Sequence, residues 1–350
     1  MASLCQLCAK PARSRCGGCT EGLTVEGEMC MTSYCSPACQ KEDWPTHKIE
    51  CKSKNLRKQL HRAADVLQRA FYVVARATWD YSEVRAERGS DGHLRMHIKS
   101  EPVHKFVGYP NLGLTGLDEK AVLAHGNAMA QVTKMAAMVQ QAFKGMGTES
   151  TVAEAPLILV LGTVAKYEVV VVVLKPEPLI DWLPLECKPP GHYVYRARLA
   201  DKSVWALDLA GAVYDNTQSL MPWTSFASQY IKSTLRTMEA GYMNWAVNAE
   251  QLNVRARLMG GQPADCWAKN NILAQVGTEL SDNALAASIS DEHGYENLAE
   301  LLKLPAVKFE RAQQQFLERL TMNFAQHINA FDKEGGVHSK LSALVAGAWP

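Results

Sequence analysis

Apolar positions recur at intervals of three and four residues along several stretches of the chain, the spacing that places them on one helical face. One such stripe, from Leu56 to Val74, predicts a helix over residues 53–88, which the turn sequence at 89–92 ends. Another runs from Phe309 to Phe331 and predicts a helix over 305–331. Further helices are predicted over residues 118–144, 223–241, 242–259 and 265–280. The tail, 335–350, is predicted to be peripheral.

Runs of β-branched residues lie between these helical stretches and predict strands. The segments at 93–100, 156–163 and 167–175 are short and strongly apolar or alternating, as strands of a half-buried sheet are. Residues 192–199 and 203–209, joined by "ADK", predict a hairpin. The pattern therefore predicts an α+β fold: a sheet of four or five strands backed by helices.

Composition and charge narrow the class of protein. The 350 residues carry 37 Lys and Arg against 36 Asp and Glu, which argues against a polyanion-binding protein. No apolar run approaches the ~20 residues of a membrane helix, and the first residues lack the features of a secretory signal. We therefore expect an intracellular protein, cytoplasmic or nuclear, with reduced thiols and no membrane contact.

A basic run follows the first cysteines. Six Lys or Arg residues stand between 48 and 62, with Glu50 as the acidic exception. We interpret this run as the solvated face of the predicted helix; contact with nucleic acid is the alternative.

Cysteines are concentrated at one end of the chain. Eight of the ten lie between Cys5 and Cys51, which in a reducing compartment indicates metal ligands and not disulfides. Seven of these eight and one histidine form four pairs, two of the form C-x2-C, one C-x3-C and one H-x3-C. The pairs are Cys5 and Cys8, Cys16 and Cys19, Cys35 and Cys39, and His47 and Cys51. Eight ligands suit two tetrahedral, structural Zn²⁺ ions, which supply folding free energy that so short a segment lacks.

Residues 1–52 resemble the MYND-type zinc finger. The eight ligands carry this resemblance, together with Tyr34, Ser36, Gln40, Trp44 and Lys48. It implies two interleaved sites. They would comprise Cys5, Cys8, Cys35 and Cys39 on one ion, and Cys16, Cys19, His47 and Cys51 on the other. The resemblance also implies that the face around Gln40 and Trp44 binds short proline-containing peptides of a protein partner. Packing of the small finger core is a compatible role for Trp44.

The segment between Cys19 and Cys35 is longer than is usual in this family and contains an extra cysteine, Cys30. We favour a loop insertion that carries a spare thiol. The alternative is that Cys30 replaces Cys35 or Cys39 as a ligand.

The large remainder of the chain offers one candidate for catalysis. His192 and Asp208 stand on the two strands of the predicted hairpin, where the carboxylate could orient the imidazole. The pattern faintly resembles the histidine–aspartate hairpin of transglutaminase-like and papain-fold proteins, which implies acyl transfer or amide hydrolysis. The nucleophile is missing, because Cys187 is too close to His192 and Cys266 follows it in the chain. A buried, hydrogen-bonded pair without catalytic function is the alternative.

MYND fingers also occur in SET-type lysine methyltransferases, but the Asn-His-Ser-Cys signature of that domain is absent here. The order of "VWALDLAGA" and "MPW" is similar to that in fungal MYND-containing proteins. We expect three parts: a finger over 1–52, a connecting helix over 53–92 and an α+β domain over 93–350. The main hypothesis is a zinc-binding adaptor protein, and the alternative is an enzyme that uses His192 and Asp208.

Overall fold

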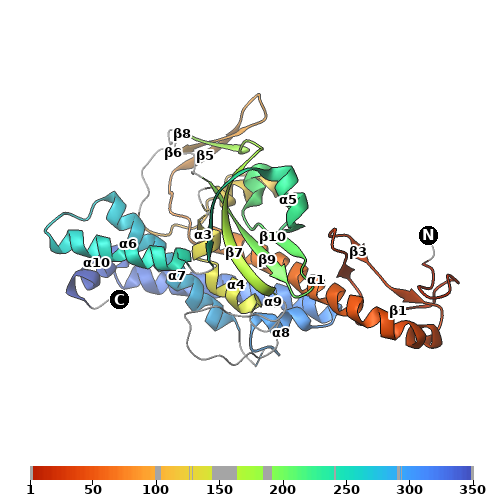
Figure 1. Cartoon of the computed structure of the whole chain (residues 1–350). Coiled ribbons are helices and arrows are strands. Elements are labelled where there is room, and N and C mark those ends of the chain that lie inside the picture. Colours follow the sequence, from red (N-terminus) through yellow and green to blue (C-terminus); the bar gives the residue numbers. More distant parts are fainter. Residues whose placement is uncertain are drawn as a thin grey trace.

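A computed structural model gives the fold, and one long helix joins its two parts (Figure 1). The structure describes residues 3–98, 104–125, 127, 129–143, 164–183, 191–239, 242–289, 292 and 294–347. Helix α1 (Pro37–Ala77) begins inside the cysteine-rich segment and continues into the main body.

The N-terminal segment contains two short antiparallel hairpins. Strands β1 (Ser14–Arg15) and β4 (Ser33–Tyr34) form the first, and β2 (Gly22–Leu23) and β3 (Met29–Cys30) form the second. The β2–β3 hairpin lies within the insertion between Cys19 and Cys35. The insertion is therefore an ordered arm, and β2 packs against α1.

The predicted helix over 53–88 was wrong at both ends. Helix α1 starts at Pro37 because the Ser36 side chain caps it, accepting a hydrogen bond from the Cys39 N–H at 3.3 Å. It ends at Ala77, and residues Val84–Arg88 form strand β5. The apolar stripe that predicted the helix stops at Val74, so nothing in it required the helix to continue to residue 88.

The main sheet has five antiparallel strands in the order β11-β10-β9-β7-β12. Their bounds are β7 (Val164–Leu174), β9 (His192–Leu199), β10 (Val204–Leu207), β11 (Leu220–Pro222) and β12 (Ile231–Glu239). The predicted hairpin and the strand at 167–175 are confirmed, and so is the α+β class. The strand predicted at 156–163 lies outside the described residues.

The helix predicted over 223–241 was wrong in its second half. Helix α5 (Trp223–Tyr230) ends where β12 begins, and β12 pairs with β7 along nearly its whole length. A second sheet was not predicted, although its strand β6 (Leu94–Ile98) confirms the strand predicted at 93–100. This sheet joins β5 to β6 and β6, in parallel, to β8 (Ile180–Leu183).

The other helices lie beside the main sheet or pack against one another (Figure 1). They are α2 (Gly116–Ala124), α3 (Ala130–Thr133), α4 (Ala136–Phe143), α6 (Tyr242–Met259), α7 (Cys266–Ser288), α8 (Leu298–Lys303), α9 (Ala306–Lys333) and α10 (Gly336–Ala346). The single helix predicted over 118–144 is thus divided. The tail is not peripheral, because α10 buries Val337, Leu341 and Leu344. Among the described residues, no helix combines the length and apolar character needed to cross a bilayer.

Helix α1 belongs to the central core of the large domain. Its residues Leu60, Leu67 and Phe71 are completely buried, and the helix packs against α9. The apolar stripe of α9 faces the same core, with Phe316 and Phe324 completely buried. The finger is therefore a direct extension of the element around which the domain is built.

The basic run at 48–62 is not simply a solvated face, contrary to the prediction. Lys54, Arg57 and Arg62 are all buried. Arg57 donates to the Asp201 carboxylate at 2.8 Å, in the β9–β10 turn, and to the Leu23 carbonyl of β2 at 2.7 Å. One guanidinium thus bridges the insertion and the main sheet.

Arg62 makes a second bridge one turn further along α1. It donates to Glu21 at 2.8 Å and to the carbonyl of Leu304 at 2.7 Å, and its guanidinium stacks on Phe309 at 4.4 Å. Buried guanidinium groups need several acceptors in fixed positions, which these two have. The insertion therefore braces the finger against the large domain.

This brace gives a prediction. Arg57→Met should lower the free energy of unfolding by about 2–3 kcal/mol, because Asp201 and the Leu23 carbonyl lose a charged donor. Arg69→Met is the matched control: Arg69 pairs with Asp65 on the exposed face, and its loss should change stability by less than about 0.5 kcal/mol. Urea unfolding of the zinc-loaded variants measures both, and equal effects would contradict the brace.

Candidate metal centre and histidine–aspartate pair

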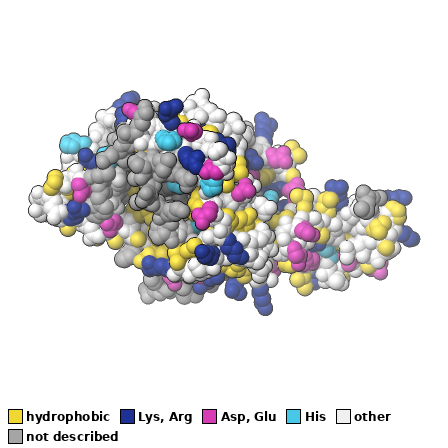
Figure 2. Space-filling view, turned by 90° about the horizontal axis from the view of Figure 1, so that it is seen from above, with side chains coloured by type: hydrophobic (Ala, Val, Ile, Leu, Met, Phe, Trp, Pro, Cys, Tyr) yellow, Lys and Arg dark blue, Asp and Glu magenta, His cyan; other side chains and the backbone are white. Residues whose placement is uncertain are grey.

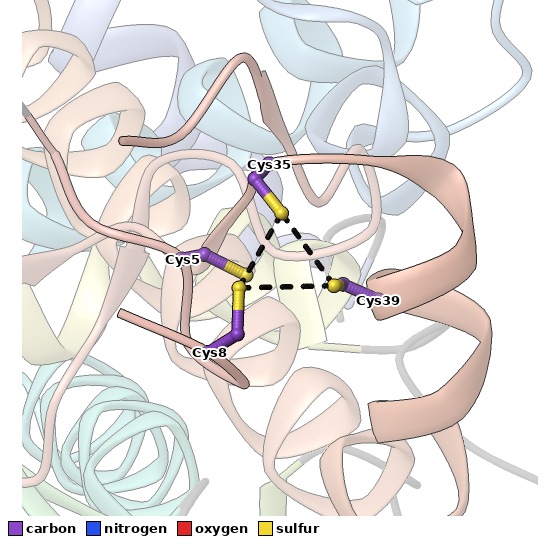
Figure 3. Close-up of side chains that lie close together, drawn as sticks. All are labelled: Cys5, Cys8, Cys35 and Cys39. Atoms are coloured by element: carbon purple, nitrogen blue, oxygen red, sulfur yellow. Dashed lines mark hydrogen bonds between the residues drawn. The ribbon is translucent and has the colours of Figure 1, made fainter. Parts of the chain in front are cut away.

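Four cysteine sulfurs meet at the outer end of the finger. Cys5, Cys8, Cys35 and Cys39 point toward one another, and all four ligand atoms lie within 4.8 Å (Figure 3). The sulfur of Cys35 is 3.5 Å from those of Cys8 and Cys39. Sulfurs bound at about 2.3 Å to one tetrahedral zinc are roughly 3.8 Å apart, so this spacing fits the ion.

The second group is buried where α1 meets the first hairpin. It consists of Cys16, Cys19, His47 and Cys51. The sulfurs of Cys16 and Cys51 are 3.7 Å apart, and the Cys19 sulfur lies 3.5 Å from His47 Nε2. A tetrahedral zinc with its usual bond lengths places sulfur and nitrogen ligands about 3.6 Å apart. Both groups are closed four-ligand sets, which makes the zinc structural.

The electrostatics of the first group favour a bound cation. Burial raises the pKa of the Cys5 thiol, but backbone N–H groups, those of Cys35 and Cys8 first, outweigh it and lower the pKa to about 6. The neighbouring Cys8 and Cys39 thiols raise the pKa of Cys35 to about 12. Four thiolates cannot share this space alone, and a divalent ion at their centre removes the repulsion.

The second group shows the same crowding around a neutral imidazole. Burial, followed by the Cys16 thiol, raises the pKa of Cys51 to about 12. Burial lowers the pKa of His47, which keeps the ring neutral and its nitrogen available to a metal. The completely buried Tyr34 packs edge-on against His47 and donates a hydrogen bond to Asp43 at 2.7 Å.

Cys30 belongs to neither four-ligand group. It lies in β3, opposite Gly22 of β2. This position agrees with a spare thiol in the insertion, and each zinc set is complete without it.

A family model described as MYND finger matches residues 5–51. These residues are a MYND finger. The interleaved ligand sets are those that the resemblance implied, and they fit two zinc ions.

Outside the finger, the comparisons place the chain in no family. The N-lysine methyltransferase SMYD2 of Gallus gallus is 51% identical over 41 residues, a match that covers 11% of this chain and 9% of that protein. The methyltransferase activity in its name is thus not carried over to this chain. No solved structure matches the chain.

Gln40 and Trp44 lie one turn apart on the same side of α1. Trp44 is 46% exposed, although its ring meets that of His47 edge-on with centroids 6.1 Å apart. Packing therefore uses only part of the indole and leaves the rest open to solvent. Their role in peptide binding stays a prediction.

His192 and Asp208 are brought together, as the hairpin predicted. The His192 Nε2 lies 2.9 Å from the Asp208 carboxylate, and both side chains are only 2% exposed. The Tyr214 ring stands edge-on to the imidazole at 5.1 Å. The pair is thus enclosed within the protein and does not open onto the surface.

Asp208 also organises the turn that follows β10. Its carboxylate accepts from the Ala210 N–H at 3.1 Å and from Asn216 Nδ2 at 3.5 Å. Gly211 is required here, since an added Cβ would lie 2.6 Å from an Asp208 oxygen. Sequence reasoning missed Asn216, although the polar "DN" at 215–216, close after Asp208, is typical of such a turn.

Within the described residues, the side chain of His192 contacts Asp208 and Tyr214, and neither is a cysteine, serine or threonine. Cys187 lies outside the described residues. Cys266 is the first residue of α7, as predicted, with Asp265 as N-cap. The catalytic role of His192 and Asp208 therefore stays a prediction.

The metal sites give a test with a matched control. The purified chain should hold two zinc ions by elemental analysis, and Cys30→Ala should keep both. Cys51→Ala should lose about one ion and loosen the finger, because a three-ligand site leaves the ion exposed to exchange. A loss of zinc from Cys30→Ala, with two ions kept in Cys51→Ala, would contradict the assignment.

Proposed function

We propose that this chain is a zinc-stabilised adaptor protein whose MYND finger binds a short proline-containing peptide of a partner. The observation that carries the proposal is the half-exposed Trp44, held on a rigid helix one turn from the zinc ligand His47. A fixed, partly exposed indole binds at low entropic cost and offers a flat surface to a proline ring. Gln40 lies beside it with an amide that can hydrogen-bond to a peptide backbone.

The surface of the finger supports this role. Seven of the fifteen large hydrophobic side chains that are exposed within the described chain belong to its first 51 residues. They are Leu4, Leu7, Val25, Met29, Met31, Trp44 and Ile49. Figure 2 shows such apolar side chains between charged ones on the projecting finger. Apolar side chains gathered on one small module are typical of a protein-contact surface.

The enzyme alternative has one observation in its favour, the hydrogen bond of 2.9 Å between His192 and Asp208. Their burial and the turn that Asp208 organises support a structural role instead. We propose that the pair fixes the end of the β9–β10 hairpin and the turn at 208–216.

Peptide capture tests the adaptor proposal. The probe is a library of labelled decapeptides with a fixed central proline, compared with the same library carrying alanine at that position. Gln40→Ala combined with Trp44→Ala should reduce retention of the proline library at least tenfold. Ile49→Ala, on the same helix and 71% exposed, should change it less than twofold. Equal retention of the two libraries by the unmodified chain would refute a proline-dependent groove.

His192→Ala separates the two interpretations of the large domain. We expect unchanged peptide capture and a loss of about 2–3 kcal/mol in unfolding free energy, because the buried Asp208 carboxylate loses the hydrogen bond from the imidazole. Urea unfolding and peptide retention are measured on the same preparation. Unchanged stability, with loss of a hydrolytic or acyl-transfer activity that the unmodified chain shows, would favour the enzyme.

A further inference from the structure

A cavity of about 540 Å³ lies where the insertion meets the large domain. Four parts of the chain line it: the β2–β3 hairpin, the middle of α1 with His61, Asp65 and Gln68, Trp205 of β10, and the segment from Thr217 through β11 into α5. This volume lies within the usual range of ligand pockets. The nearest lining residue of α1, His61, stands 17 positions after Trp44, roughly 25 Å along the helix. The cavity is therefore separate from the peptide-binding face of the finger.

The hairpin wall is held in place by close packing. Gly27, at its tip, has a φ of +87°, and a Cβ added there would lie 3.2 Å from Pro222. Thr24 Oγ1 accepts from the N–H groups of Glu26 and Glu28, which fixes the turn. This hairpin is part of the insertion that makes the segment between Cys19 and Cys35 longer than is usual in the family. The cavity is therefore formed by that insertion.

Three polar side chains of the cavity, Gln68, Glu26 and Asp65, offer acceptor oxygens, and His61 and the hydroxyl and amide side chains of residues 217–229 line it as well. Gln68 is more than nine-tenths buried; its Nε2 donates to the Asp208 carbonyl at 3.4 Å, while its Oε1 has no partner within the described residues. The Glu26 carboxylate likewise has none in that part of the chain. Asp65 accepts from Arg69 at 3.0 Å and from Gln313 at 2.6 Å, and each oxygen keeps a second lone pair.

No Lys or Arg lines the cavity, although Arg69, outside the lining, pairs with Asp65. The cavity also has an apolar side made by Trp205, Leu220 and Pro222. A guanidinium group matches this combination, because it carries five donors and no acceptor, and its weakly hydrated plane packs on apolar surface. We propose that the cavity binds the arginine side chain of a partner peptide. The partner chemistry follows from charge complementarity with Glu26, and from the lone pairs that Asp65 keeps beside its contacts with Arg69 and Gln313.

The test uses the full zinc-loaded chain and three probes. They are acetyl-Gly-Arg-Gly-amide, the same peptide with lysine, and the same peptide with citrulline, which has the shape of arginine without its charge. Binding is followed by NMR shifts of the backbone amides around Gly27 and Ser219. The arginine peptide should bind at least fivefold more tightly than the lysine peptide, and the citrulline peptide should not saturate.

Glu26→Gln and its matched control Glu28→Gln identify the site. Both residues are exposed on the same hairpin, but only Glu26 lines the cavity. Glu26→Gln should weaken arginine binding at least fivefold, and Glu28→Gln less than twofold, with two zinc ions retained in each. Equal effects of the two variants, equal binding of arginine and citrulline peptides, shifts confined to the region of Trp44, or absence of binding at 10 mM peptide would each overturn the proposal.

Discussion

The two zinc sites and the domain core share one helix, and this constraint organises the molecule. Three zinc ligands, Cys39, His47 and Cys51, lie in the first turns of α1, and the same helix supplies completely buried core residues further along. Pro45 stands between the ligands and cannot donate a helical hydrogen bond. Zinc ligands on both sides of Pro45 stabilise a part of the helix that lacks this backbone hydrogen bond.

The metal centre could be predicted from the sequence because coordination chemistry fixes both the ligand types and their number. The spacing along the chain was enough to pair ligands that lie three or four residues apart. The resemblance to the MYND finger indicated which pairs share a zinc ion. The hairpin that carries His192 and Asp208 could also be predicted, because alternating apolar and polar residues and a short turn specify it. These features depend on residues that are close in the sequence.

The remainder depended on contacts over long separations. No sequence feature near Arg57 indicates that its partners are Leu23 and Asp201. Arg57 was therefore predicted to lie on a solvated helix face, although it is buried and joins two parts of the fold. The residues of β12 read equally well as a continuation of α5, and pairing with β7 decides between the two. The small second sheet joins β6 to β8 across more than eighty residues, which no local pattern specifies.

The central position of α1 has a consequence for synthesis of the chain. Arg62 finds its carbonyl acceptors about 240 residues later, at Leu302 and Leu304. At about 5–20 residues per second, a ribosome needs roughly 10–50 s to supply them. The finger can take up zinc within the first seconds, whereas the apolar side of α1 must wait for α9. During that interval the nascent chain exposes an anchored hydrophobic helix, the kind of surface that chaperones bind.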